Sequence, residues 1–184
     1  ANIVDDMIYN AGMGEPQYLY QVEDYDRALS TEYGVDVYGR VLRILREQDL
    51  LGGATVLLAC DTMLEFEGHT YGKPGTRASV VSRWMRMRGR QGVVHTGHYV
   101  AVLRDGTMRQ APREAVTVLS FADLTEQEIA DYAATGEPEG VAGGFTIDSF
   151  GGPFITRIEG DPHNIVGISL PLVRQILLDL GVAW

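Results

Sequence analysis

Cysteine is almost absent from this sequence, which has one, Cys60, in 184 residues. A single thiol cannot form a disulfide within the chain, so a disulfide-stapled fold is excluded. Cys60 ends an apolar run at residues 54–60, which favours a buried structural thiol, since a reactive thiol needs an electropositive, partly exposed site. Membrane-spanning apolar runs and a signal peptide are also lacking, so we expect a cytoplasmic protein with no membrane partner.

Positive charge is scarce as well. There are 15 lysines and arginines against 25 acids, and the net charge is −10. This charge disfavours nucleic-acid polymers and anionic membranes as partners, because both would be repelled. If the protein handles phosphates, it needs local cations, either a few basic side chains or a divalent metal.

The rest of the composition is that of an ordinary globular domain, with 45% hydrophobic and 22% charged residues. The length suits one domain, which could have two lobes. Predicted strands alternate with predicted helices, which indicates an α/β fold. The strands are expected at residues 54–60, 63–66, 93–104, 107–121 and 154–158, and the helices at 36–51, 76–88, 124–136 and 171–180.

Local signals mark two of these elements. Asp105 and Gly106 both tolerate positive φ, so they suit a tight hairpin turn between the two long strands. Thr125 and Glu128 are spaced as a capping box, in which each side chain satisfies a free amide at the helix start. The helix at 76–88 should face inward with Val81, Trp84 and Met85.

The candidate chemistry centres on residues 59–74. Asp61 follows the buried strand at 54–60, and the carboxyl ends of strands are where α/β folds bind ligands. A turn at residues 67–69 and a loop at 72–74 could bring Lys73 to face Asp61 across a hairpin. An acid and a base in one pocket suggest chemistry on an anionic substrate. Alternatively, Asp61 is a turn or capping residue and Lys73 is solvated.

Other polar and aromatic groups have two interpretations each. The arginines at 77, 83, 86, 88 and 90 form either a binding patch or a solvated face. The tyrosines at 18, 20, 25 and 33 either stack on a base or pack at the rim of a core. The glycine-dense stretch at 140–153 either lets backbone amides approach a ligand or merely permits turns.

Several segments together resemble the Maf-like nucleoside triphosphate pyrophosphatases, also called septum formation inhibitor proteins. They occur in the family's order and the similarity covers roughly residues 54–182. The segments are CDTMLEFEG (60–68), YGKP (71–74), HTGHYV (95–100), VTVLSFADLTEQEIADYAATGEP (116–138), AGGFTIDSFGGPFITRIEGD (142–161) and NIVGISLPLV (164–173).

The resemblance implies a fold and an activity. The fold would be an elongated mixed β-sheet flanked by helices, with a cleft between two lobes and residues 1–184 as one domain. The activity would be hydrolysis of a nucleoside triphosphate to the monophosphate and pyrophosphate, with magnesium or manganese as cofactor. Such an enzyme removes non-standard or excess nucleotides. A homodimer is one candidate assembly.

The resemblance also assigns roles to residues. Asp61 would be the central carboxylate, acting as general base or holding the metal through water, and Lys73 would neutralise phosphate charge. Attack of water at phosphorus needs such a base and such a cation. Thr62, Thr96 and Gly97 would lie near the substrate.

Three acids complete the assignment. Asp148 occupies a position where many members carry glutamine near the nucleotide, which leaves the preferred base open. Glu159 and Asp161 would be further metal or water contacts, or else solvated turn residues. Because magnesium keeps several waters, few protein ligands are required.

The sequence departs from the family at its amino end. Members carry a phosphate-binding SxSxRR loop after a first strand, and residues 1–53 contain no such motif, although Val4-Asp5-Asp6 is similar to an acidic spot of the family. Either that strand and loop lie ahead of Ala1 in a longer chain, or the protein has lost them. If they are lost, a catalytically inactive nucleotide-binding or regulatory protein, or a structural partner-binding protein, becomes the alternative.

Overall fold

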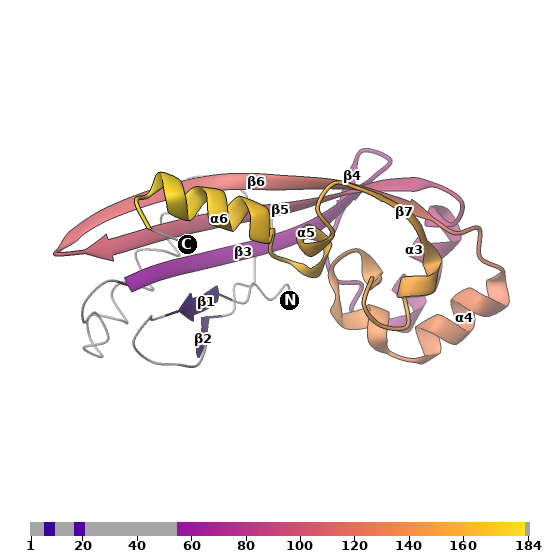
Figure 1. The fold of residues 1–184 in the computed structure, drawn as a ribbon. Helices are drawn as coiled ribbons and strands as arrows, with labels where there is room; N and C mark the ends of the chain where they lie inside the picture. Colours follow the sequence, from indigo (N-terminus) through magenta and orange to yellow (C-terminus); the bar gives the residue numbers. More distant parts are fainter. Residues whose placement is uncertain (1–5, 10–16, 21–54, 183–184) are drawn as a thin grey trace. The chain divides into compact units, whose positions relative to one another are not determined.

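The computed structural model describes residues 6–9, 17–20 and 55–182 (Figure 1). The helix predicted from Asp36 lies outside the described residues, as do Tyr25 and Tyr33. In the described ranges, no helix is long and apolar enough to cross a bilayer.

The described chain folds into one sheet and several helices, so the α/β class is confirmed. The strands are β1 (Asp6–Tyr9), β2 (Gln17–Tyr20), β3 (Thr55–Phe66), β4 (His69–Tyr71), β5 (Gln91–Arg104), β6 (Thr107–Phe121) and β7 (Ile155–Glu159). The helices are α3 (Arg77–Met87), α4 (Glu126–Ala134), α5 (Pro162–Val166) and α6 (Leu170–Asp179), with 3₁₀ helices η1 (Glu137–Gly140), η2 (Ala142–Gly144) and η3 (Gly152–Phe154).

The strand order in the sheet is β2-β1-β3-β5-β6-β7, with β4 paired to β3 (Figure 1). We expected a mixed sheet, but the four pairings with a described register, β1 with β2, β1 with β3, β3 with β4 and β6 with β7, are all antiparallel. For β3 and β4 the reason is the tight turn at Glu67-Gly68, since such a turn can join antiparallel strands only. The turn between β5 and β6 is the predicted Asp105-Gly106, with φ of 50° and 73°.

One boundary was predicted wrongly. We expected a strand to end at Cys60 and another to begin at Met63, but β3 runs without a break from Thr55 to Phe66. Asp61 therefore lies inside a strand and not at its end. The chain stays extended because β3 pairs with β1 around Leu57 and with β4 beyond Leu64, so both sides of Asp61 are held in the sheet.

The chain divides into two compact units, each with its own core. Unit 1 comprises the described part of Ala1–Asp61, together with Gly97–Glu114 and the described part of Leu170–Trp184. Its core packs residues of α6 against those of β5. The buried residues there are Val100, Val102, Ile176 and Leu180.

Unit 2 comprises Thr62–Thr96 and Ala115–Ser169. Its core centres on Trp84 of α3, whose ring meets Phe121, Tyr132 and Phe154 edge-to-face at centroid distances of 5.5, 5.8 and 5.9 Å. Trp84 is buried as predicted. The predicted inward partners Val81 and Met85 are half-buried, whereas Val80 and Met87 are fully buried.

The capping box of α4 is confirmed. Thr125 accepts from the Glu128 amide at 3.2 Å, and the Glu128 carboxylate accepts from the Thr125 amide at 2.7 Å. Leu124 and Ile129, on either side of the cap, are both buried in the unit 2 core. Local sequence signals therefore place α4 correctly.

Candidate functional site

A chain of hydroxyl groups links β3, β5 and α5 in unit 2. The Oγ1 atoms of Thr62 and Thr96 lie 2.9 Å apart, and the Thr96 hydroxyl donates to the carbonyl of Asn164 at 2.8 Å. A hydroxyl has one proton, so Thr96 accepts from Thr62. The structure thus brings together two of the residues expected near the substrate, and it fixes the orientation of both.

Asn164, which the sequence reasoning missed, fastens α5 to the sheet. Its side chain is fully buried, and its amide nitrogen donates to the Val94 carbonyl at 3.2 Å, the Ala115 carbonyl at 3.2 Å and the Thr117 hydroxyl at 3.1 Å. The buried nitrogen of this amide is thereby paired, as most buried polar groups are. Its signal was the start of the NIVG segment, where one polar residue precedes apolar ones.

The other two expected residues on these strands lie in unit 1. Asp61 precedes Thr62 on β3 and Gly97 follows Thr96 on β5, and both residues are half-buried. The β1 and β4 pairings on either side hold the backbone at Asp61 extended.

Lys73 lies in the predicted loop between β4 and α3, in unit 2. The loop is held at both ends: the Gly72 carbonyl accepts from Arg83 Nη1 at 2.6 Å and from the Gly143 amide at 3.3 Å, and the Gly75 amide donates to the Glu139 carbonyl at 2.9 Å. Within the described part of the chain, no hydrogen bond or ion pair engages the Lys73 side chain. It is also the sole lysine among residues 1–184.

A glycine allows this loop to pack closely. A Cβ on Gly144, whose φ is 82°, would lie 2.9 Å from Pro74 Cγ. The glycine-dense stretch therefore serves the Lys73 loop by close backbone approach and by positive φ.

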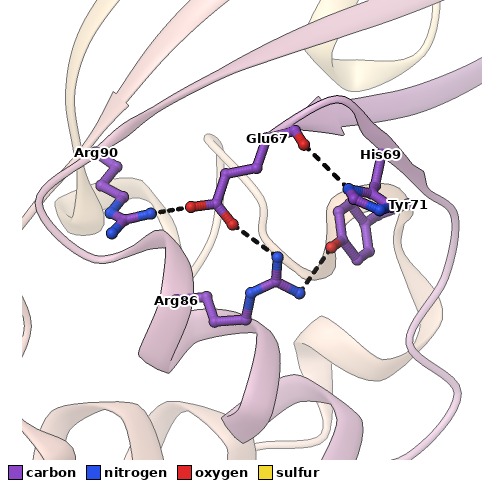
Figure 2. A network of polar contacts seen from close by, with 5 residues as sticks. All are labelled: Glu67, His69, Tyr71, Arg86 and Arg90. Atoms are coloured by element: carbon purple, nitrogen blue, oxygen red, sulfur yellow. Dashed lines mark hydrogen bonds and ion pairs between the residues drawn. The ribbon is translucent and has the colours of Figure 1, made fainter.

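Arginines on α3 and just after it are engaged within the molecule. Arg86 and Arg90 both pair with Glu67, Arg86 also donates to the Tyr71 hydroxyl at 2.9 Å, and His69 donates to the Glu67 carbonyl at 3.0 Å (Figure 2). Hydrogen bonding from Arg86, with the charge of Arg90, lowers the pKa of Glu67. This network holds the β3–β4 hairpin against α3.

The remaining arginines near α3 also bond to carbonyls. Arg77 donates to Ala130 at 3.2 Å and Arg88 to Leu124 at 3.0 Å. Arg83 was expected to face outward, but it is half-buried over the Tyr71 ring at 4.8 Å, and this burial lowers its pKa. The interpretation of these arginines as a binding patch is therefore not needed, since each has a structural role.

Asp148 is exposed in the loop 146–151, and Glu137 holds that loop. The Glu137 carboxylate accepts from Thr146 Oγ1 at 2.5 Å, the Phe150 amide at 3.0 Å and the Gly151 amide at 3.0 Å. Burial acts to raise the pKa of Glu137, but hydrogen bonds from Ser149, Thr146 and these two amides outweigh it and lower the pKa to about 2. The carboxylate is therefore charged at neutral pH.

Comparison with known proteins identifies the family. A family model described as Maf-like protein matches residues 18–180. The chain belongs to the Maf-like family. It is 45% identical over 186 residues to the nucleoside triphosphate pyrophosphatase of Cutibacterium acnes (strain DSM 16379 / KPA171202), an alignment that covers 97% of this chain and 86% of that protein.

Two other relatives carry the same name. The Maf-like chain is 51% identical over 128 residues to the protein of Salinispora tropica, covering 70% of this chain and 56% of that one. It is 45% identical over 130 residues to the protein of Mycobacterium sp. (strain JLS), an alignment that covers 69% of this chain and 62% of that protein. The matched region thus spans less than two thirds of these two relatives.

The two acids at the end of β7 and just after it have structural partners in this Maf-like chain. Asp161 caps α5, accepting from the amide and the Nδ1 of His163 at 3.0 and 2.8 Å. Burial acts to raise the pKa of Asp161, but hydrogen bonds from Ser169 and His163 lower it. Glu159 is exposed and pairs with Arg157 at 2.9 Å. A metal role for either stays a prediction.

The side chains present bear on the divalent metal expected for the family. Among the described residues, no three His, Cys, Asp or Glu side chains gather into a metal cluster. The family resemblance does not require one, because Mg²⁺ is commonly held by one or two carboxylates together with substrate phosphates and water. Asp61, a half-buried carboxylate, fits that mode of binding.

Proposed function

We propose that this Maf-like protein hydrolyses a nucleoside triphosphate to the nucleoside monophosphate and pyrophosphate. The observation that carries the proposal is the 45% identity, over 97% of the chain, to a relative named nucleoside triphosphate pyrophosphatase. The chain retains an acid, Asp61, and a cation, Lys73, of the types that this reaction requires. The single match over residues 18–180 supports treating both units as one Maf-like domain.

Asp61 is the proposed general base. It orients a water molecule and takes its proton as the water oxygen bonds to the α-phosphorus, while the bond from that phosphorus to the pyrophosphate oxygen breaks. Lys73 balances negative charge on the phosphates, and its amine has no competing partner among the described residues. A bound Mg²⁺ or Mn²⁺ would supply further neutralisation of the phosphate oxygens.

Substrate contacts are proposed for Thr62, Thr96, Gly97 and Asp148. The orientation of the two threonine hydroxyls, set by the Asn164 carbonyl, supports a role in positioning the nucleotide. Asp148 would contact the nucleotide base and set the preference among bases. House-cleaning of non-standard or excess nucleotides in the cytoplasm, and a homodimeric assembly, complete the proposal.

Pyrophosphate release tests the activity. The full-length protein is incubated with a panel of common and modified nucleoside triphosphates and Mg²⁺ or Mn²⁺. We expect Asp61→Asn to lower kcat by about 100-fold or more, since general-base catalysis contributes at least that much. A chelator should stop the wild-type reaction, and added metal should restore it.

The matched control is Asp105→Asn, in the exposed β5–β6 turn, where asparagine also tolerates the positive φ. It should keep the wild-type rate. A folded Asp61→Asn variant with a wild-type rate would remove Asp61 from the mechanism. Absence of pyrophosphate release from the folded wild type, with every substrate, would overturn the proposed activity itself.

A further inference from the structure

Glu137 is the charged centre of a second polar cluster in unit 2. One carboxylate oxygen accepts from the Tyr132 hydroxyl at 3.0 Å, from Thr146 Oγ1 at 2.5 Å and from the Gly151 amide at 3.0 Å. The other accepts from the Phe150 amide at 3.0 Å. Hydrogen bonds to a charged carboxylate are roughly twice as strong as neutral ones, so the loop is firmly held.

These donors lie on both sides of Asp148 in the chain. Thr146 precedes Asp148 by two residues, and the amides of Phe150 and Gly151 follow it by two and three. The Asp148 side chain itself is exposed, and within the described part of the chain no hydrogen bond or ion pair engages it. Glu137 therefore closes the loop around a carboxylate that has no structural partner there.

The loop has little freedom to move away from Glu137. A Cβ on Gly151 would lie 2.5 Å from the Tyr132 hydroxyl and 2.7 Å from the Thr146 carbonyl, so the backbone passes through a space that only glycine fits. Tyr132 itself is buried in the unit 2 core, which fixes it. Burial also raises the pKa of Tyr132, so it remains a protonated donor to Glu137.

Glu137 is held in place by the helix before it. It follows Gly136, whose φ of 77° turns the chain at the end of α4, and it opens η1. Two residues further, the carbonyl of Glu139 accepts from the Gly75 amide of the Lys73 loop. The short η1 segment thus contacts both loops that carry proposed substrate contacts. The Glu139 carbonyl bonds to the loop that carries Lys73, and the Glu137 carboxylate bonds to the loop that carries Asp148.

We propose that Glu137 is a positioning residue, which fixes the loop 146–151 and thereby sets the discrimination among nucleoside triphosphates that Asp148 exerts. This inference rests on the proposed function and on the proposed contact between Asp148 and the base. Glu137 does not touch the substrate. It acts by holding the backbone on both sides of Asp148.

The test compares Glu137→Gln with Glu139→Gln in the full-length protein. Glutamine keeps the shape but lacks the charge, and its NH₂ group turns one acceptor into a donor facing donors. Glu139 is the matched control, because it lies in the same η1 segment and no hydrogen bond engages its carboxylate within the described part of the chain. Two readouts are taken: amide hydrogen exchange of residues 145–152, and the ratio of kcat/KM for the two best nucleoside triphosphates.

We expect Glu137→Gln to speed exchange in residues 145–152 but not in α3, and to change the kcat/KM ratio by about tenfold, as the loss of a charged anchor implies. Glu139→Gln should change neither. In an Asp148→Asn background, Glu137→Gln should produce a much smaller further change in the ratio, since both substitutions act on one contact.

The outcomes separate the two proposals. Wild-type turnover with an unchanged ratio in folded Glu137→Gln, or a full additive effect in the Asp148→Asn background, would overturn this inference alone. No turnover in the wild type would overturn the proposed function and this inference with it. If Glu137→Gln does not fold, Thr146→Val removes one donor instead. Faster exchange in residues 145–152, with a change in the kcat/KM ratio smaller than that of Glu137→Gln, would support the inference. Wild-type values of both readouts would overturn it.

Discussion

Two basic side chains of unit 2, Arg83 and Lys73, differ in their contacts. Arg83 donates to the Gly72 carbonyl and lies over Tyr71, so its charge is used within the fold. The Lys73 side chain, one residue after Gly72, has no such partner among the described residues. The arginine suits the structural role because its planar fork donates in fixed directions. A lysine ammonium is a compact point charge, which suits the role proposed for Lys73 in balancing phosphate charge.

We expect Lys73→Ala to lower kcat with triphosphate substrates by about 100-fold, because a cation placed at developing phosphate charge contributes that order. Lys73→Arg should retain part of the rate. Since Lys73 is the sole lysine in residues 1–184, an amine reagent should label it in these residues, and triphosphate should protect it. The measurement is peptide mapping with and without nucleotide, alongside steady-state kinetics. An unchanged rate in Lys73→Ala would exclude Lys73 from the mechanism.

Elements differ in how far their own residues specify them. The start of α4 follows from Thr125 and Glu128, which satisfy each other's free amides. The Glu128 carboxylate accepts hydrogen bonds from the Thr125 backbone and side chain, and these bonds lower the pKa of Glu128. The β5–β6 turn follows from Asp105 and Gly106, which adopt positive φ at little cost. Both elements were predicted because the deciding interactions lie within a few residues.

Thr125→Ala should therefore destabilise the protein by about 1 kcal/mol, the usual cost of removing a helix cap. Chemical denaturation measures the change. Ser82→Ala is the control, since Ser82 is exposed in α3 and no hydrogen bond engages its side chain in the described residues. It should cost nothing measurable. Equal stability of Thr125→Ala and the wild type would show that the capping box contributes little.

Acid stability is a property of the whole chain. Hydrogen bonds and ion pairs lower the pKa of Glu67, Glu128, Glu137, Asp161 and Asp179. As the pH falls, the unfolded chain binds protons before the folded chain does, so acid favours unfolding. For Glu137 this stabilisation is present above its ordinary pKa of 4.5 and is lost as the pH falls to about 2. Protonation also reduces the −10 net charge and with it the repulsion within the folded chain, which favours the folded state.

We expect the lowered pKa values to dominate, so the urea midpoint should stay level between pH 7 and 6 and fall from about pH 5 toward pH 3. Glu137→Gln should have a lower midpoint at pH 7 and a shallower fall below pH 5, because its side chain does not titrate. A wild-type midpoint that is constant or rises down to pH 3 would show that charge relief prevails.

The sequence by itself determined the α/β class, the family resemblance, the hairpin turn and α4. These depend on local spacing or on side-chain chemistry, which do not require distant partners. The sequence did not determine that β3 continues through Asp61, since pairing with other strands of the sheet, among them β1 and β4, keeps that backbone extended.

Tertiary structure also decided which polar residues are structural. Asn164, Arg83 and Glu137 bond to groups 70, 11 and up to 14 residues away in sequence, so the neighbouring residues could not identify these partners. Asp161 differs from these three, because it caps α5 by accepting from His163, only two residues further along the chain. Partners that are distant in the chain and close in space are set by packing of the cores. That packing also separates the side chains bonded within the fold from those, such as Lys73 and Asp148, that no hydrogen bond or ion pair engages among the described residues.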